Sequence, residues 1–385
     1  MKNFSKIIFI NNNFKPFFLF LKMRSNYTVL GVMSGTSLDG VDMALINFEI
    51  NCNRWRYQLK CAETITYDDV WVNKLKSAIS YDYNSQYIKQ LNKDYTYYLS
   101  ELINVFIEKS QFFSMDFISS HGHTIFHQPD KGYTLQIGNL QQLANLTKHK
   151  VVCDFRTQDV LLGGQGAPLV PIGDQLLFDD FHYCLNLGGF SNISFNQNGK
   201  RIAYDVCPVN TVLNYYASKE GVNYDKNGEI AKKGQVNMTL LKQLNQISYY
   251  QKTYPKTLGV EFLNKDFYRV VKKSEKQLKN QDILRTLVEH IACQIVSSIH
   301  GQGKRILLTG GGVHNQFLIR RLNELSPINH WCIPNNQLID FKEALIFGLL
   351  GVRYMRNEIN VLSSVTGAKE NHCSGKLFIP EIIEK

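Results

Sequence analysis

Three glycine-rich strings contain residue types that can bind an anion. They are GVMSGTSLDGVD at residues 31–42, LNLGGFSN at 185–192 and LLTGGGVHN at 307–315. Glycine adopts backbone conformations closed to other residues, so such turns can direct several N–H groups at one ligand, and Ser and Thr add hydroxyl donors. The three strings therefore predict a site for phosphate groups.

The first string offers both donors and carboxylates. We expect the following residues to face a nucleotide: Gly31, Ser34, Gly35, Thr36, Ser37, Asp39, Gly40 and Asp42. The string lacks the GK[ST] of a Walker A loop and the GxGxxG that precedes a dinucleotide-binding helix. The carboxylates of Asp39 and Asp42 could hold Mg²⁺ through water, as a hard cation prefers. Alone, the string could equally be an ordinary hairpin.

The second and third strings extend the nucleotide-binding hypothesis. The residues that we expect at the nucleotide are Gly188, Gly189, Asn192, Gly310, Gly311 and Gly312. Each string has a simpler interpretation, because two glycines can make a tight turn and three can permit close packing of a strand and a helix. Three such loops in one chain nevertheless favour a cleft with phosphates held by one loop per half and adenosine by the third.

The hydrophobic pattern predicts the elements that would position these loops. Strands are expected at 27–33, 41–48, 55–65, 117–120, 151–155, 183–187, 191–195, 202–206 and 305–309, and helices at 139–147, 211–219, 283–299, 317–325 and 341–356. Leu91, Tyr95, Tyr98, Leu102 and Phe106 recur at helical spacing, which indicates a core-facing stripe. A strand meander followed by helix and strand units occurs twice. The fold class predicted is therefore α/β, with two similar lobes and a ligand-binding cleft between them.

Length and composition agree with a two-lobed globular enzyme. The chain has 385 residues, of which 44% are hydrophobic and 20% charged, enough for a substantial core. The net charge is +10, but half of it comes from five basic residues within the first 25 positions. No basic block follows, so we expect no nucleic-acid partner. The eight cysteines form no CxxC pair, which favours neither a zinc site nor a disulfide framework and suggests the cytoplasm.

The first residues are apolar and basic, as in a signal peptide, but Asn11–Asn13 and Pro16 interrupt the run. We expect no membrane association and assign 1–26 to a non-core extension, with an upstream start at Met1 as the preferred explanation and a peripheral anchor as the alternative. Residues 27–180 would form the first lobe, with the phosphate loop and sugar-site residues. Residues 181–385 would form the second, with phosphate and adenosine loops and the catalytic Asp.

From residue 27 to 356 the chain resembles the anhydro-N-acetylmuramic acid kinases, which have the actin/Hsp70/sugar-kinase fold. The strings that carry the resemblance are GVMSGTSLDGVD, SHGHTIFHQP (120–129), LQIGN (135–139), CDFRTQDVLLGGQGAPLVP (153–171), LNLGGFSNIS and TGGGVHN. The resemblance implies that ATP and Mg²⁺ are used to open the 1,6-anhydro ring of anhydro-N-acetylmuramic acid and phosphorylate O6. The product would be N-acetylmuramic acid 6-phosphate, in cell-wall recycling, and a homodimer is also suggested.

The resemblance identifies Asp205 as the catalytic base, because the family's catalytic aspartate lies at the matching position of a DxGPGN-like string. Here the string reads DVCPVN, so Cys207 and Val209 stand where the family usually has glycines. Both changes reduce backbone freedom next to the base. Either the loop is built differently or catalysis has been lost.

The substrate-binding residues that we expect are His123, Asp154, Arg156, Gly166 and Glu343. Arg156 can bind the lactyl carboxylate through two parallel hydrogen bonds, although a structural ion pair with a neighbouring aspartate is the competing interpretation. His123 replaces the family's usual Gln but can still donate and accept. Two alternatives stay open: another ATPase or phosphohydrolase of this fold, and a non-catalytic sugar- or nucleotide-binding regulator.

Overall fold

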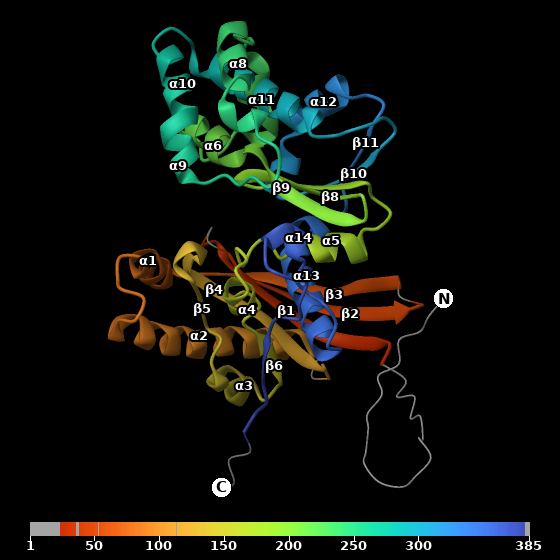
Figure 1. Ribbon diagram of the computed structural model, residues 1–385. Coiled ribbons are helices and arrows are strands. Elements are labelled where there is room, and N and C mark those ends of the chain that lie inside the picture. The colour runs from red at the N-terminus through yellow and green to blue at the C-terminus, as the bar shows by residue number, and fades with distance from the viewer. Residues whose placement is uncertain (1–23, 36–37, 53, 113, 382–385) are drawn as a thin grey trace.

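The computed structural model describes residues 24–35, 38–52, 54–112 and 114–381. These residues form two α/β lobes, each built around its own sheet (Figure 1). Of the predicted N-terminal extension 1–26, residues 1–23 lie outside the described residues. Arg24 is described, and its guanidinium makes a two-pronged ion pair with Asp116.

The first sheet has seven strands, in the order β12-β6-β4-β1-β2-β3 with β5 paired to β4. Its strands are β1 (Asn26–Ser34), β2 (Gly40–Asn51), β3 (Arg54–Thr66), β4 (Phe117–Gln128), β5 (Tyr133–Ile137), β6 (Val151–Cys153) and β12 (Lys376–Phe378). The meander β1–β2–β3 is antiparallel, whereas β4 pairs with β1 in parallel.

The second sheet repeats the same order with five strands, β11-β10-β7-β8-β9. Its strands are β7 (Tyr183–Leu187), β8 (Phe190–Gln197), β9 (Lys200–Pro208), β10 (Arg305–Thr309) and β11 (His330–Cys332). Again an antiparallel meander is extended by a parallel strand next to its first member. This duplication confirms the predicted fold class, two similar α/β lobes.

The helices of the first lobe pack on both faces of its sheet. They are α1 (Asp69–Ala78), α2 (Gln86–Ser110), α3 (Gln141–Thr147), α4 (Thr157–Leu161) and α13 (Asn336–Met355), with the 3₁₀ turn η1 (Pro129–Lys131). Two short helices, α5 (Pro171–Leu177) and α14 (Ser363–Thr366), lie between this sheet and the second one (Figure 1). The predicted stripe lies on α2, and its Tyr95 is fully buried. On the other face, α13 lies so close to β1 that a Cβ at Gly31 would be 2.1 Å from the Ala344 carbonyl oxygen. Only glycine fits there.

The second lobe carries its helices mainly on one side of its sheet (Figure 1). They are α6 (Asn210–Ser218), α7 (Glu229–Lys233), α8 (Met238–Asn245), α9 (Val260–Phe262), α10 (Tyr268–Ser274), α11 (Asn280–Ser297) and α12 (Gln316–Leu325). Short turns accompany them: η2 (Lys226–Gly228), η3 (Ser248–Gln251), the π-type η4 (Leu263–Phe267) and η5 (Gly311–His314). Most apolar residues of α11 are buried against this sheet and the neighbouring helices.

The chain returns to the first lobe at its C-terminal end. Helix α13 packs on β1, β2 and β4, and β12 pairs with β6. The sequence-based division placed residues 181–385 in the second lobe, whereas residues from 336 to 378 largely pack with the first. Helix α13 is apolar on most of its circumference, so its pattern could not indicate which sheet it covers.

A buried ion cluster joins the two lobes. The carboxylate of Asp174 on α5 lies 2.7 Å from the Lys342 ammonium on α13 and 3.9 Å from the Arg201 guanidinium on β9. Ser194 on β8 donates to Asp174, and Arg201 donates to Ser194. The exposed fractions of Asp174, Lys342 and Arg201 are 4%, 6% and 4%. Charges buried this deeply are tolerated because they compensate one another.

Within the described part of the chain, no helix combines the length and apolar character required to span a bilayer.

Replacing Lys342 by Met should lower the free energy of unfolding by roughly 2–4 kcal/mol, since a buried carboxylate would keep only one, more distant cation. Lys109→Met is the matched control, because its ion pair with Glu63 is largely exposed and should contribute less than about 1 kcal/mol. Urea unfolding followed by circular dichroism measures both. Equal losses in the two variants would contradict a structural role for the buried cluster.

Candidate functional site

Three backbone segments meet at one end of the second sheet. The turn between β7 and β8 contains Gly188 and Gly189, whose carbonyls accept hydrogen bonds from the N–H groups of Asn210 (3.1 Å) and Val209 (2.8 Å). The Asn210 amide donates to the Leu187 carbonyl at 3.2 Å. The start of α6 is thereby fixed to the turn. Asn192 is exposed on β8 and lies opposite Asp205 in the β8–β9 register.

The third glycine string packs against this turn. Gly310 has φ +82°, and a Cβ there would lie 2.6 Å from the Asn186 Oδ1. A Cβ at Gly312 would be 2.9 Å from the Leu187 carbonyl oxygen. Gly311 is instead exposed. Two of the three glycines thus allow close contact between backbones, while Gly189 and Gly311 leave an exposed backbone surface without side chains. Such a surface suits the flat base and phosphates of a nucleotide.

Asp205 lies near the end of β9 and its carboxylate is held by the backbone. The N–H of Leu258 donates to Asp205 Oδ2 at 2.8 Å, and the Asp205 N–H donates to the Lys256 carbonyl at 3.2 Å. Tyr249 donates to the Asp205 carbonyl. Burial raises the pKa of the Asp205 carboxyl, and the Leu258 hydrogen bond partly opposes this. Among the described residues, no cation pairs with this carboxylate, which leaves its other oxygen available to accept a proton.

Sequence reasoning missed the segment that holds Asp205. Residues 249–258 lie more than forty positions away in the chain, and they have neither a glycine cluster nor a helical or strand pattern. Lys256 lies over the rings of Tyr204 and Tyr249, at 5.4 and 4.9 Å from their centroids. The sequence held no signal for this pairing, because the contacts to the Asp205 carboxylate and N–H are made by backbone groups of Leu258 and Lys256.

A second group of polar residues lies in the first lobe. Arg156 donates through Nε to His121 Nε2 at 2.9 Å and through a terminal nitrogen to the Gly166 carbonyl at 2.7 Å. Burial lowers the pKa of Arg156 to about 10, with the carboxylates of Glu343 and Asp159 opposing this. At that pKa the guanidinium remains charged at neutral pH. Its remaining donors can bind an anionic ligand.

Asp159 shapes the loop that carries Gly166. It is fully buried, and its two oxygens accept from the Gly166 N–H and the Thr366 hydroxyl, both at 2.7 Å. The predicted Asp154 accepts from Thr157 at 2.5 Å and has φ +58°. The carboxylate of Asp154 is therefore engaged at the start of α4.

Glu343 on α13 belongs to the same environment as Arg156. Its side chain is exposed to solvent, yet burial raises the pKa of its carboxyl, an effect that Arg156 counteracts and Asp42 reinforces. We therefore group Arg156 and Glu343, with Asp42 nearby, as one polar surface.

The first glycine string contributes to this surface through its ends. Asp42 accepts from Thr64 at 2.6 Å, and burial raises its pKa, with Asp39 and Asp340 adding to the rise. Thr36 and Ser37 lie outside the described residues. Ser34 is buried, and its hydroxyl hydrogen-bonds Tyr67 and His123.

The other members of the string differ in exposure. Gly35 is partly buried and accepts from the Leu38 N–H at 3.3 Å. Asp39 is exposed, whereas Gly40 packs against the Ile65 carbonyl on β3. Among the described residues, no group of three His, Cys, Asp or Glu side chains is arranged to hold a metal ion.

Comparison with known proteins identifies the family. The family model described as anhydro-N-acetylmuramic acid kinase matches residues 27–380. The chain belongs to the anhydro-N-acetylmuramic acid kinase family. It is 32% identical over 386 residues to the enzyme of that name from Haemophilus influenzae, covering 93% of this chain and 99% of the relative. The Mannheimia succiniciproducens relative is 34% identical over 373 residues, covering 91% and 98%.

Two solved structures resemble the fold remotely. Component A of the Acidaminococcus fermentans (R)-2-hydroxyglutaryl-CoA dehydratase has a TM-score of 0.43 at 13% identity, covering 84% of this chain and 96% of that one. The ADPNP-bound activator of the Clostridium difficile 2-hydroxyisocaproyl-CoA dehydratase has a TM-score of 0.41 at 11% identity, covering 86% and 97%. Likenesses this distant support no conclusion about what this chain binds.

Neither residue that departs from the family's pattern beside Asp205 has the positive φ that favours glycine. Val209 has φ −125° and ψ −91°, outside the usual helical and extended regions, and Cys207 lies within β9 without positive φ. Cys207 is buried and hydrogen-bonded to Ser191, and burial raises the pKa of its thiol to about 12. A thiol with such a pKa is a poor nucleophile at neutral pH. The loop thus keeps Asp205, Pro208 and Asn210 in a backbone that other residues can adopt.

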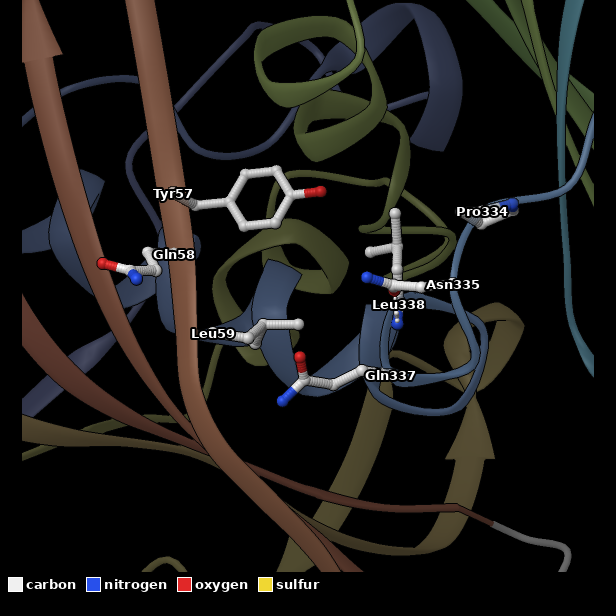
Figure 2. A pocket seen from close by; sticks show the side chains of 7 residues that line it. All are labelled: Tyr57, Gln58, Leu59, Pro334, Asn335, Gln337 and Leu338. Carbon is white, nitrogen blue, oxygen red and sulfur yellow. Dashed lines mark hydrogen bonds between the residues drawn. The ribbon is translucent and has the colours of Figure 1, made fainter.

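Two hollows on the surface lie apart from these residues. One of about 280 Å³ is lined by Tyr57, Gln58 and Leu59 of β3 and by Pro334, Asn335, Gln337 and Leu338 around the start of α13 (Figure 2). Another of about 470 Å³ is lined by residues of 54–57 and by Leu177, Asp179 and Asp180. Neither contains a predicted site residue, so the site is better defined by its polar groups, which lie on two lobes.

Proposed function

We propose that the chain is an ATP-dependent kinase that hydrolytically opens 1,6-anhydro-N-acetylmuramic acid and phosphorylates O6, giving N-acetylmuramic acid 6-phosphate in peptidoglycan recycling. The observation that carries the proposal is the family match over residues 27–380, with Asp205 at the position of the family's catalytic aspartate. The proposed enzyme is a phosphotransferase that transfers the phosphoryl group of ATP to an alcohol oxygen, O6 of the sugar.

Asp205 is the base in this proposal. Its carboxylate takes a proton from water as the water oxygen bonds to the anomeric carbon. The bond from that carbon to O6 breaks, O6 bonds to the γ-phosphorus, and ADP departs with the electrons of the broken phosphoanhydride bond. The raised pKa of Asp205 supports this role, because a carboxylate of higher pKa is a stronger base toward the proton of water.

We assign ATP to the backbone of the second lobe at the exposed Gly189 and Gly311, with Gly188, Gly310 and Gly312 shaping the two turns and the first glycine string closing over the phosphates. Bound Mg²⁺ would neutralise phosphate charge. Asp39 and Asp42 would contact this cation through water, and a positive charge nearby would offset the repulsion from Asp39 and Asp340 that helps to raise the pKa of Asp42.

We assign the muramyl sugar to the first-lobe surface. Arg156 would bind the lactyl carboxylate, and Glu343, His123 and the Gly166 loop would contact the remaining polar groups. Because Asp205 lies on the other lobe, catalysis requires the lobes to close over both substrates. A cytoplasmic location fits the need for ATP and the lack of disulfide bonds within the described residues, and a homodimer remains part of the proposal.

The Asp205→Asn variant should release ADP about 10²- to 10⁴-fold more slowly in the presence of the anhydro-sugar, the range expected for loss of a general base. Nucleotide affinity, measured by calorimetric titration with ADP, should be unchanged. Asp69→Asn is the control, because Asp69 is exposed on α1, and it should retain full turnover. Normal ADP release by Asp205→Asn would refute the assignment, and silence of the wild type with and without sugar would favour a regulator.

As the pH is lowered, kcat/KM should begin to fall at a pH above 3.8, the ordinary pKa of an aspartate. Asp205 acts as the ionised base and its pKa is raised, so protonation begins to remove activity at a higher pH than for an exposed aspartate. Glu343→Gln tests the assignment, because Glu343 also has a raised pKa. If the acid limb disappears in Glu343→Gln, Glu343 rather than Asp205 sets it.

Arg156→Lys should raise KM for the sugar roughly 10- to 100-fold while leaving KM for ATP unchanged. Lysine keeps the charge but loses the fork that contacts His121, Gly166 and a ligand carboxylate, and each charge-assisted hydrogen bond contributes about 1.5–3 kcal/mol. Steady-state assays with each substrate varied separately measure the two constants. Sugar-independent hydrolysis of ATP or polyphosphate that Arg156→Lys leaves intact would favour the phosphohydrolase alternative.

A further inference from the structure

His123 ends a chain of buried hydroxyl groups. Its Nδ1 lies 2.7 Å from the Ser34 Oγ, which lies 2.6 Å from the Tyr67 hydroxyl, which in turn lies 2.5 Å from the Tyr95 hydroxyl. The exposed fractions are 2% for Ser34, 9% for Tyr67, 0% for Tyr95 and 3% for His123. The chain connects the end of β1 to β4, to the segment after β3 and to α2.

Counting hydrogens fixes the direction of this chain. Three hydrogen bonds join the four groups, and each uses one hydrogen. The three hydroxyls supply three hydrogens. If His123 Nδ1 also carried a hydrogen, four hydrogens would share these three short hydrogen bonds, and one buried hydroxyl would lose its short hydrogen bond as a donor, which is costly. Every hydrogen has a place in the three short bonds only if Tyr95 donates to Tyr67, Tyr67 to Ser34 and Ser34 to His123 Nδ1.

We propose that the hydroxyls of Tyr95, Tyr67 and Ser34 hold His123 in the neutral Nε2–H tautomer, so that Nε2 donates a hydrogen bond to an oxygen of the sugar. The donor role rests on the function proposed above. Nε2 has no hydrogen-bond partner among the described residues. The acceptor can be a hydroxyl, ether, carbonyl or carboxylate oxygen of the sugar. Ser34, Tyr67 and Tyr95 are positioning residues that act through the ring.

Burial supports a single ring proton, because it lowers the pKa of His123 to about 4 and keeps the imidazole neutral near pH 7. The neighbouring His121 has the opposite arrangement. Its Nδ1 lies 2.8 Å from the Gly122 carbonyl, which can only accept, and its Nε2 accepts from Arg156. His121 is therefore the Nδ1–H tautomer and orients Arg156.

The tautomers also explain how His123 can replace Gln. The amide of Gln has both a donor and an acceptor, and the hydroxyl chain satisfies the acceptor nitrogen of the ring. The ring is left with one free donor, Nε2–H, which can take the place of the N–H donor of the Gln amide.

Nitrogen NMR of the full-length protein with ¹⁵N-labelled histidine tests the tautomer without any ligand. His123→Gln identifies the His123 signals by their loss. We expect an unprotonated Nδ1 and a protonated Nε2 near pH 7.5. In Ser34→Ala the Nδ1 resonance should shift toward that of an acceptor with no hydrogen bond. A protonated Nδ1 in the wild type would overturn the proposal, whether or not the chain phosphorylates the sugar.

The donor role is tested by two substitutions of His123. Met has a similar size but no donor, so His123→Met should raise KM for the anhydro-sugar about tenfold or more, with KM for ATP unchanged, because a ligand oxygen would lose its partner. His123→Gln restores a donor and should keep KM within about threefold of the wild type. Equal KM values for His123→Met and the wild type would overturn the donor role. A wild type that does not phosphorylate the sugar refutes the proposed function and with it the donor role, whereas the tautomer is judged by NMR alone.

Discussion

The carboxylate of Asp174 is the point at which the two lobes are electrostatically tied together. A buried carboxylate needs compensating cations, and here they come from different parts of the chain, Lys342 on α13 and Arg201 on β9. Burial lowers the pKa of Lys342 while Asp174 raises it, and the balance is a raised pKa, so the ammonium stays charged. Neither cation can leave without exposing an unpaired charge to an apolar interior. The cluster therefore restricts how α5, α13 and β9 can move relative to one another.

Helix α13 and strand β9, which carry the two cations paired with Asp174, also carry residues assigned to the sugar site and to catalysis. Glu343 directly follows Lys342 on α13, and Asp205 is four residues beyond Arg201 on β9. A strand directs alternate residues to the same face, although the β8–β9 register shifts between Ser191 and Asn192. A motion that closes the lobes would thus bring the base toward the sugar-binding surface around this cluster. Charge pairing at the joint would restrict the direction of that motion.

Much of the fold could be predicted because its strands and long helices have clear periodicity. The two meanders, α2 and α11 fall where the pattern indicated them, and the repeated order predicted two lobes. The return of α13 to the first sheet could not be predicted, because a helix apolar nearly all round fits either lobe. For the site, glycine clusters indicated where backbones meet. The sequence could not show that the Leu258 N–H holds Asp205, since a backbone donor leaves no signature. Nor could it show that Ser34 faces His123, because its residue type suits a phosphate equally well.

The residues that depart from the family's pattern gain a role once their burial is considered. Cys207 and Val209 are both completely buried and belong to the core cluster between the second sheet and its helices. A glycine at either position would leave that space for other side chains to fill, so the larger residues add apolar contact beneath the loop. Neither residue has the positive φ that favours glycine, so their side chains fill the space below the loop without a left-handed backbone. The Asp205 carboxylate accepts from the Leu258 N–H, a contact that involves neither Cys207 nor Val209. Packing below the loop and the position of the Asp205 carboxylate therefore depend on different residues.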